Sequence, residues 1–237
     1  MNIFGLSKRG LVRTGNEDKF YTDGTAFSIL ADGMGGHVGG EMASETVIAE
    51  VKSYVLADTS DWKNEVTLQE AVLAANAAIR EKVREDSRLD GMGSTALVTY
   101  IEDGFMFWAH VGDSRIYLYG DGVLRQVTED HSLVAQLIAA GEMTPEEAAT
   151  HPSRHVITRS VGTEDRLEVD AGRVMLESGN MILMCSDGLT SMLDDEVIRN
   201  TLIMHEHDAE GCVHELMRLV YEAGAKDNVT IIALLVE

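Results

Sequence analysis

The chain has 237 residues and a net charge of −21, from 40 acidic and 19 basic side chains. Nucleic acids and anionic membrane surfaces are bound through basic faces, so this charge argues against both as partners. Hydrophobic residues make up 45% of the sequence, which excludes global disorder and predicts one folded domain over residues 1–237. A phosphate-bearing substrate stays compatible with the charge if cations neutralise the site.

Neither a secretory leader nor a membrane span is predicted. Residues 1–12 contain no long apolar core, and no run approaches the 18 apolar residues that a spanning helix needs. The two cysteines, Cys185 and Cys212, cannot build a disulfide framework. We therefore expect a cytoplasmic protein, and we expect it to be monomeric.

Apolar periodicity predicts alternating groups of strands and helices. In chain order, the predicted elements are a strand at 26–31, a helix at about 40–57, a helix from a capping box at 67–70, strands at 94–101, 105–111, 115–119 and 123–127, a helix at 132–140, strands at 167–176 and 181–185, helices at 194–204 and 209–223, and a strand at 229–236. Hairpin-type turns at 102–104 and 120–122 make residues 94–127 an antiparallel meander. Because this is not βαβ alternation, the pattern favours a layered sandwich.

Residues 141–162 interrupt this pattern. The segment is polar, poorly periodic and contains both prolines of the chain, so it is predicted to be an inserted flap. A capping box at Thr144 predicts a short helix within it. His151, Arg154 and His155 of the flap could contact a substrate, although a solvated loop is the alternative.

Four aspartates lie at the ends of predicted strands. Asp32, Asp113 and Asp187 each follow a strand, and Asp227 precedes the last one. If that last strand is antiparallel to the others, all four carboxylates meet at one edge of the sheets. Such a cluster repels itself unless cations lie between its members, and oxygen ligands suit Mg²⁺ or Mn²⁺. Taken singly, each Asp could also be a turn residue.

A glycine-rich stretch at residues 33–40 follows a predicted strand and leads into a helix, which is the usual setting of a phosphate-binding loop. It lacks both the Gly-Lys-Ser/Thr ending of a P-loop and the spacing of a dinucleotide-binding loop. Within it, His37 is a candidate general acid or an ordinary loop histidine. Upstream, Arg13 could bind phosphate oxygens through its guanidinium or be a solvated surface charge.

These motifs, taken in order, resemble those of the metal-dependent serine/threonine protein phosphatases of type 2C, in their compact bacterial form. The matching stretches are RTGNED at 13–18, ADGMGGH at 31–37 with GEMAS at 40–44, GSTA at 93–96, HVGDSR at 110–115, TEDHS at 128–132, ITRSVG at 157–162, CSDGL at 185–189 and DNVT at 227–230. The resemblance covers essentially the whole chain as a bare catalytic domain.

The resemblance implies an α+β fold with four layers, α-β-β-α, in which helices flank two mainly antiparallel sheets. It implies that Asp32 bridges two metal ions and that the carbonyl of Gly33 binds one of them. Asp187 and Asp227 would complete the other ion, and Asp113 with Asp187 would hold a third ion. The ions would be Mn²⁺ or Mg²⁺.

The remaining site residues are assigned in the same way. Glu17 and Asp18 would act on the ions through water, and Arg13 would hold the substrate phosphate. The resemblance implies direct attack on phosphorus by a hydroxide that bridges the two ions. The general acid is a departure, because animal relatives have a histidine where this chain has Met34, so His37 is the candidate replacement.

The resulting prediction is a phosphatase that hydrolyses phosphoserine and phosphothreonine in proteins and opposes a bacterial serine/threonine kinase. A catalytically silent metal-binding regulatory module of the same fold is the alternative. A metal-dependent nuclease or nucleotide hydrolase is disfavoured, because basic clusters are lacking and aromatic residues make up only 5% of the chain.

Overall fold

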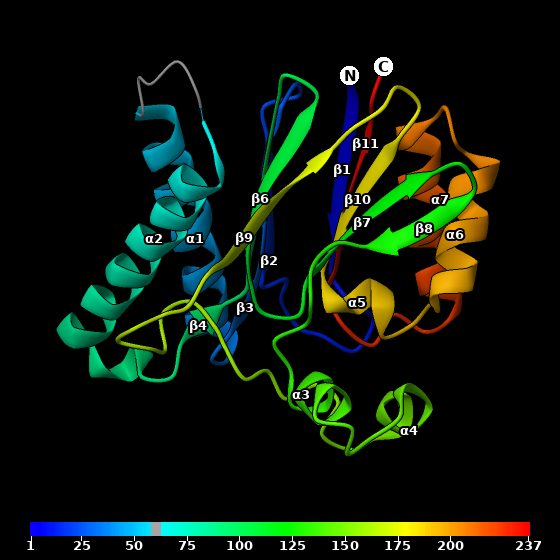
Figure 1. Ribbon diagram of the computed structural model, residues 1–237. Helices are drawn as coiled ribbons and strands as arrows, with labels where there is room; N and C mark the ends of the chain where they lie inside the picture. Colours follow the sequence, from blue (N-terminus) through cyan, green and yellow to red (C-terminus); the bar gives the residue numbers. More distant parts are fainter. Residues whose placement is uncertain (58–62) are drawn as a thin grey trace.

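The computed structural model describes residues 1–57 and 63–237. Two antiparallel sheets pack face to face at its centre (Figure 1). One sheet has the strand order β1 (Asn2–Lys8), β11 (Val229–Leu235), β10 (Met181–Cys185), β7 (Arg115–Gly120) and β8 (Val123–Gln126). The other has the order β2 (Asp18–Thr22), β3 (Phe27–Met34), β5 (Ala96–Glu102), β6 (Phe105–Val111) and β9 (Asp170–Met175), with β4 (Gly93–Ser94) paired to β3.

Helices cover the outer face of each sheet, which gives four layers (Figure 1). The outer face of the six-stranded sheet carries α1 (His37–Ala57) and α2 (Glu65–Glu85), followed by a single 3₁₀ turn (Ser87–Leu89). The outer face of the five-stranded sheet carries α6 (Asp195–Met204) and α7 (Ala209–Glu222). Three short helices lie at the lower end of the layers: α3 (Leu133–Ala139), α4 (Pro145–Thr150) and α5 (Asp187–Thr190). The predicted α+β sandwich of four layers is confirmed.

Strand alternation distributes the apolar residues over three cores. In β3, Ile29 and Ala31 pack with α1 and α2, whereas Leu30 packs against the opposite sheet. Ile232 of β11 faces Leu30 from the other side of the same inter-sheet core. A third core lies between the five-stranded sheet and the helices that cover it. Both sheets are therefore buried on two faces, which fixes the register of the central strands.

Apart from the two-residue β4, two strands were not predicted, β1 and β2, and each lies at the edge of its sheet. Their side chains are mostly half-buried, so they lack the continuous apolar run of a central strand. In β2, Phe20 packs in the inter-sheet core and Tyr21 packs against the helical side. Alternation was therefore the available signal, but it extends over too few residues to be distinctive.

The predicted start of the second helix is wrong. The helix begins at Glu65, and Thr67 lies inside its first turn. Its cap is Asn64, whose side-chain oxygen accepts hydrogen bonds from the backbone N–H groups of Val66 and Thr67 at 3.0 and 3.2 Å. By contrast, the predicted capping box at Thr144 is confirmed by reciprocal bonds with Glu147.

The two candidate caps of α2 can be separated by mutation. We expect Asn64→Ala to lower the free energy of unfolding by about 1 kcal/mol, because two N–H groups lose their acceptor. Thr67→Ala is the matched control, and we expect it to change stability by less than about 0.5 kcal/mol. Urea denaturation of both variants measures the difference. A larger loss for Thr67→Ala would restore the original prediction.

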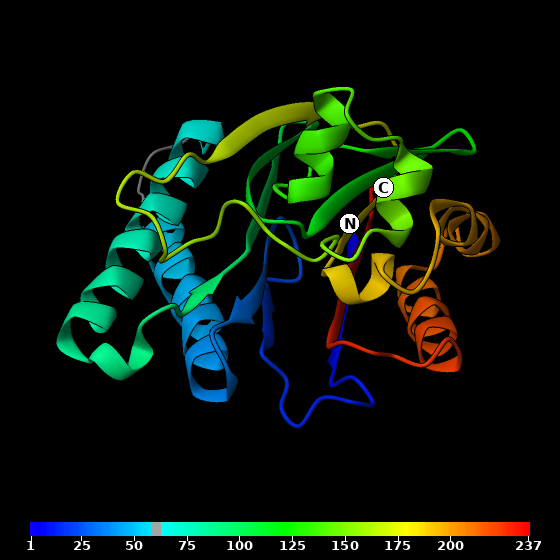
Figure 2. The same ribbon diagram turned by 90° about the horizontal axis from the view of Figure 1, so that it is seen from below.

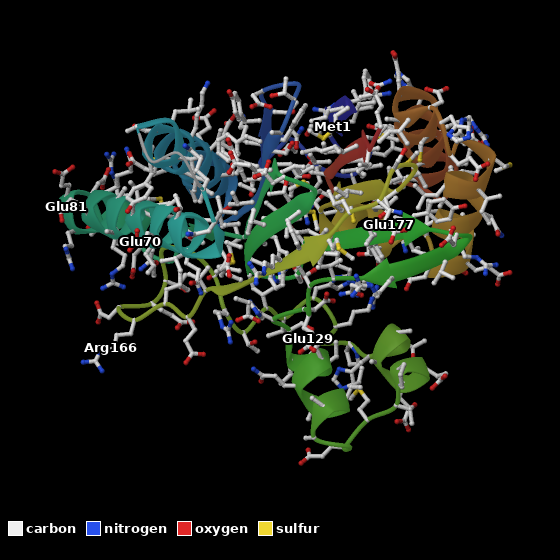
Figure 3. All side chains as sticks on the ribbon, turned by 45° about the horizontal axis from the view of Figure 1, so that its top comes forward. Met1, Glu70, Glu81, Glu129, Arg166 and Glu177 are labelled. Atoms are coloured by element: carbon white, nitrogen blue, oxygen red, sulfur yellow. The ribbon has the colours of Figure 1, made fainter. Side chains whose placement is uncertain are left out.

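The acidic excess of the chain is carried on its surface. Glu70 and Glu81 project outward from α2, and Glu177 lies exposed on the loop before β10 (Figure 3). Within the described ranges, none of the helices is both long enough and apolar enough to cross a bilayer.

Candidate active site

The predicted site residues meet around one cavity of about 610 Å³ at the end of the two sheets. Its lining includes seven of the nine predicted residues, namely Arg13, Glu17, Asp32, Gly33, Asp113, Asp187 and Asp227. The antiparallel pairing of β10 and β11 brings the end of one strand beside the start of the other. The prediction required the last strand to run antiparallel to the strands that end at the other aspartates, and this is confirmed for β10.

One boundary is corrected. Asp32 does not follow its strand but lies within β3, which continues to Met34. The extension arises because β4 pairs with the end of β3, with Gly33 opposite Ser94. A two-residue strand gives little periodic signal, so the extension could not be predicted from the pattern.

The backbone of Asp32 is held on both sides. Its N–H donates to Thr95 Oγ1 at 2.9 Å, and its carbonyl accepts from Thr95 N at 2.8 Å and from Ser94 Oγ at 2.9 Å. The next residue must be glycine, because a Cβ on Gly33 would lie 1.9 Å from the carbonyl oxygen of Gly40. The carboxylate of Asp32 therefore projects from a rigid backbone.

Asp18 lies behind this wall, directly opposite Asp32 in the β2–β3 pair. Its side chain is buried, and Oδ2 accepts hydrogen bonds from Ser186 Oγ at 2.8 Å and Thr230 Oγ1 at 2.7 Å. Among the described residues, Oδ1 has no hydrogen-bond donor. A buried carboxylate oxygen without a donor beside a second carboxylate is the chemistry that a cation, or water bound to one, satisfies.

The carboxylates of the site destabilise one another's charged form. Burial raises the pKa of Asp18 and of Asp113 to about 6. Burial also raises the pKa of Asp32 well above its usual range, and the neighbouring carboxylates of Asp18 and Asp187 raise it further. The pKa of Asp187 is raised in the same way, by burial and by the carboxylates of Asp113 and Asp227. All-oxygen donor sets of this kind fit hard divalent cations such as Mn²⁺ and Mg²⁺.

Across the described ranges, no three His, Cys, Asp or Glu side chains converge as tightly as the ligands of a single ion. This spacing agrees with the mutual repulsion of the carboxylates. Which carboxylate binds which ion therefore stays a prediction.

Arg13 reaches the site from the loop that follows β1. Its Nη2 donates to Asp227 Oδ2 at 2.5 Å, and half of its side chain stays exposed. The guanidinium thus lies on the cavity wall beside a carboxylate, where it can also contact an anion that enters from solvent.

Glu17 lies beside the start of α1. Its carbonyl accepts from Ser44 Oγ at 2.5 Å, and a Cβ on Gly40 would lie 2.2 Å from Glu17 Oε2. Two glycines, Gly33 and Gly40, thus allow this glutamate, β3 and α1 to approach one another. Its predicted action through water is not tested by these contacts.

The flap contributes to the cavity more than expected. Arg154 and His155 line it, and His155 Nδ1 lies 3.9 Å from Asp187 Oδ2, whereas His151 is not among the lining residues. His37 forms the first residue of α1. Its side chain lies outside the described part of the structure, so its role as general acid stays a prediction.

Further residues that were not predicted also line the cavity, and they include Thr95, Ser191, Met192, Lys226 and Asn228. Thr95 and Asn228 lie within stretches that carried the family resemblance, so that resemblance was an available signal. Lys226 precedes Asp227 directly, but one lysine beside one aspartate is not a distinctive pattern.

Comparison with known families agrees with this geometry. The sequence matches the family described as "Protein phosphatase 2C" over residues 12–228. The chain belongs to this family. It is 38% identical over 237 residues to protein phosphatase PhpP of Streptococcus pneumoniae, a match that covers 98% of this chain and 96% of PhpP.

Solved structures give the same result. The crystal structure of the serine/threonine phosphatase PstP/Ppp of Mycobacterium tuberculosis superposes with a TM-score of 0.92 and 37% identity, over 100% of this chain and 99% of that one. A structure of the PstP catalytic domain in complex with two manganese ions has a TM-score of 0.89 and 35% identity. This match covers 100% of the present chain and 98% of the PstP chain. The predicted metal-dependent serine/threonine phosphatase is thereby confirmed as the class of this enzyme.

The raised carboxyl pKa values predict an unusual pH dependence of stability without divalent ions. Unfolded aspartate loses its proton near pH 3.9, whereas Asp18 and Asp113 keep theirs in the folded state up to about pH 6. Between these values the folded state binds more protons than the unfolded state. The free energy of unfolding should therefore fall as the pH rises from about 4 through about 6, and the contribution of these two groups should level off above their folded pKa.

Thermal unfolding in excess EDTA at several pH values measures this slope. Asp18→Asn removes one of the titrating groups, so its slope should be shallower than that of the wild type. Asp121→Asn, in the exposed turn between β7 and β8, is the control for a general change of charge. Parallel slopes for Asp18→Asn and the wild type would contradict the prediction.

Proposed function

We propose that this chain is a manganese- or magnesium-dependent phosphatase that removes the phosphoryl group from phosphoserine and phosphothreonine in proteins. The observation that carries the proposal is the convergence of Asp32, Asp113, Asp187 and Asp227 with Arg13 in one cavity. The name of PhpP and the two manganese ions bound by the PstP catalytic domain support it.

In this proposal different aspartates would bind different metal ions. Asp32 would contact two ions, with the Gly33 carbonyl on one and with Asp187 and Asp227 on the other. Asp113 and Asp187 would hold a third. When bound, the ions would supply a water of lowered pKa as nucleophile and positive charge for the phosphoryl oxygens.

The residues of the chain would orient the substrate and move its proton. Arg13 would bind the phosphoryl oxygens by paired N–H donors. His37 would donate a proton to the departing serine or threonine oxygen, because it follows Gly35 and Gly36 of the cavity wall directly. Glu17 and Asp18 would fix water beside the ions.

A covalent phosphoenzyme through cysteine is not part of the proposal. Cys185 is fully buried in β10, and burial raises the pKa of its thiol to about 12. Cys212 is also buried, with a pKa raised to about 12. Neither thiol is available as a thiolate nucleophile near neutral pH.

Hydrolysis of p-nitrophenyl phosphate and of phosphoserine and phosphothreonine peptides tests the proposal. We expect turnover with Mn²⁺, less or equal turnover with Mg²⁺, and complete loss with EDTA that excess Mn²⁺ reverses. Mn²⁺ binding by calorimetry without turnover of any of these substrates would favour the silent regulatory module. Faster turnover of ATP or DNA than of phosphopeptides would favour the nuclease or nucleotide hydrolase.

The assigned role of Arg13 gives a further expected result. Arg13→Ala should lower kcat/KM for phosphopeptides by about 10- to 100-fold, since a charge-assisted contact is worth about 1.5–3 kcal/mol. Arg13→Lys should recover only part of this loss, because an ammonium group lacks the planar pair of donors. Steady-state kinetics measure both variants. Equal activity of Arg13→Ala and wild type would contradict the role of Arg13 in binding the phosphoryl group.

The setting of the enzyme also belongs to the proposal. We propose that it acts as a cytoplasmic monomer whose substrates are made by a bacterial serine/threonine kinase. A comparison of the phosphoproteome with and without the gene would identify these substrates.

A further inference from the structure

A second cavity, of about 540 Å³, opens beside the first; we call it the flap cavity. It lies between α3, the flap helix α4 and the segment from α5 to the start of α6. Seen from below, α3 and α4 lie across the end of the sandwich, close to α5 (Figure 2). The two cavities share six lining residues: Asp113, Arg154, His155, Asp187, Ser191 and Met192. They therefore form one continuous depression.

The walls of the flap cavity are mainly apolar away from this junction. One wall is made by Val134 and Ile138 of α3 and by Ala148 and Ala149 of α4, and Leu193 lies on the side of α6. Six of the seven residues of α3 are apolar, yet none of them is fully buried. The packing of the fold thus leaves this helix with apolar surface that faces the cavity.

Two charged groups of the flap cavity, Arg115 and Asp130, form an ion pair with each other. Arg115 donates to both carboxylate oxygens of Asp130 at 2.8 and 2.7 Å. Asp194 caps α6 by accepting from Val197 N at 2.9 Å. A ligand carboxylate would meet like charge at Asp194, Asp113 and Asp187 and opposite charge at Arg154, whereas an apolar side chain would contact the exposed apolar wall without this competition.

We propose that the flap cavity binds an apolar side chain of the phosphoprotein substrate, close in sequence to the phosphorylated residue. This inference rests on the proposed function of the catalytic cavity, because the phosphoryl group must occupy that cavity. An extended chain advances about 3.3–3.6 Å per residue. Since the cavities share a wall, the apolar residue lies within about three positions of the phosphorylated one. The flap then selects substrates by sequence.

A set of phosphopeptides tests this selection. Each peptide carries one phosphothreonine, and Leu or Asp is placed at each position from three before it to three after it. We expect one position at which kcat/KM is at least about 10-fold higher for Leu than for Asp, as is typical of a hydrophobic pocket. The readout is the ratio of the two kcat/KM values, because a loss of activity that affects both peptides equally leaves this ratio unchanged.

Variants with charged residues in the flap test whether the ratio of kcat/KM for Leu and Asp peptides depends on this cavity. Ala149→Glu and Ala149→Lys each place a charge on the exposed lining of α4, and we expect both to bring the ratio toward one. Ala139→Glu is the matched control, because Ala139 is exposed on α3 and does not line the cavity, and it should keep the ratio. Melting curves of all variants verify that they fold.

Three results would overturn the inference. The first is that no position discriminates Leu from Asp, and the second is that Ala139→Glu lowers the ratio as much as Ala149→Glu does. Opposite effects of Ala149→Glu and Ala149→Lys would show an electrostatic preference instead of an apolar one. Failure of the proposed function itself is recognised separately, since wild-type enzyme with Mn²⁺ would then leave p-nitrophenyl phosphate intact.

Discussion

Replacement of Asp32 by Asn is expected to lower kcat with Mn²⁺ by more than about 100-fold. Loss of a residue that only hydrogen-bonds to a metal ligand costs up to about 100-fold, and loss of a ligand itself should cost more. Asparagine keeps the shape of the side chain but lacks the negative charge that would bind two cations. In EDTA the same variant should melt at the same temperature as the wild type or higher. The reason is that Asp32 lies among buried carboxylates that raise its pKa, so removal of its charge relieves repulsion.

Kinetics, calorimetric titration with Mn²⁺ and melting curves distinguish a lost metal site from a lost fold. Asp121→Asn changes the same functional group in an exposed turn and should alter none of the three measurements. Wild-type activity of Asp32→Asn, or a clear drop of its melting temperature in EDTA, would contradict the assigned role.

A single methyl group at Gly188 should damage both the fold and the site. A Cβ at this position would lie 1.9 Å from the backbone oxygen of Asn228 and 3.1 Å from a methyl of Val229. The backbones that carry Asp187 and Asp227 are therefore in direct contact, and Gly188→Ala must separate them. We expect a loss of about 1–3 kcal/mol in the free energy of unfolding. Activity should fall by about 100-fold, because a shift of about 1 Å in a catalytic group costs that much.

Chemical denaturation and kinetics of Gly188→Ala measure the two effects. Gly15→Ala is the control for stability, since a Cβ at Gly15 would meet no atom within 4 Å and its backbone is not left-handed. If Gly188→Ala were as stable and active as wild type, the close contact between the two segments would not be needed for function.

The convergence of the aspartates on one cavity could be predicted because it depends on strand direction. Asp187 after one strand and Asp227 before the next come together in any antiparallel pair, and the hairpin turns of the meander already indicated antiparallel sheets. The mutual repulsion of clustered carboxylates then indicated that cations bind between them. The family resemblance then implied the expected roles of the remaining residues.

Other features depend on contacts between distant parts of the chain. The hydroxyls of Ser186 and Thr230 that bind Asp18 lie 168 and 212 residues away from it, and although both belong to stretches that carry the resemblance, no local pattern predicts that they contact Asp18. The approach of Arg154 and His155 to the cavity depends on how the flap packs, which periodicity does not describe. At α2, both Asn64 and Thr67 are good caps, and only the packed helix decides between them.

The carboxylates of the site come from both sheets. Asp32 belongs to β3 of the six-stranded sheet, Asp187 and Asp227 flank β10 and β11 of the five-stranded sheet, and Asp113 lies in the segment that crosses between them. Elsewhere the sheets adhere through the apolar inter-sheet core. Bound divalent ions would therefore act as a non-covalent staple between the halves of the molecule, so that the free energy of ion binding also opposes their separation. Fluctuations that part the sheets at this end, and the amide exchange or proteolysis that follows from them, become rarer as cation occupancy increases.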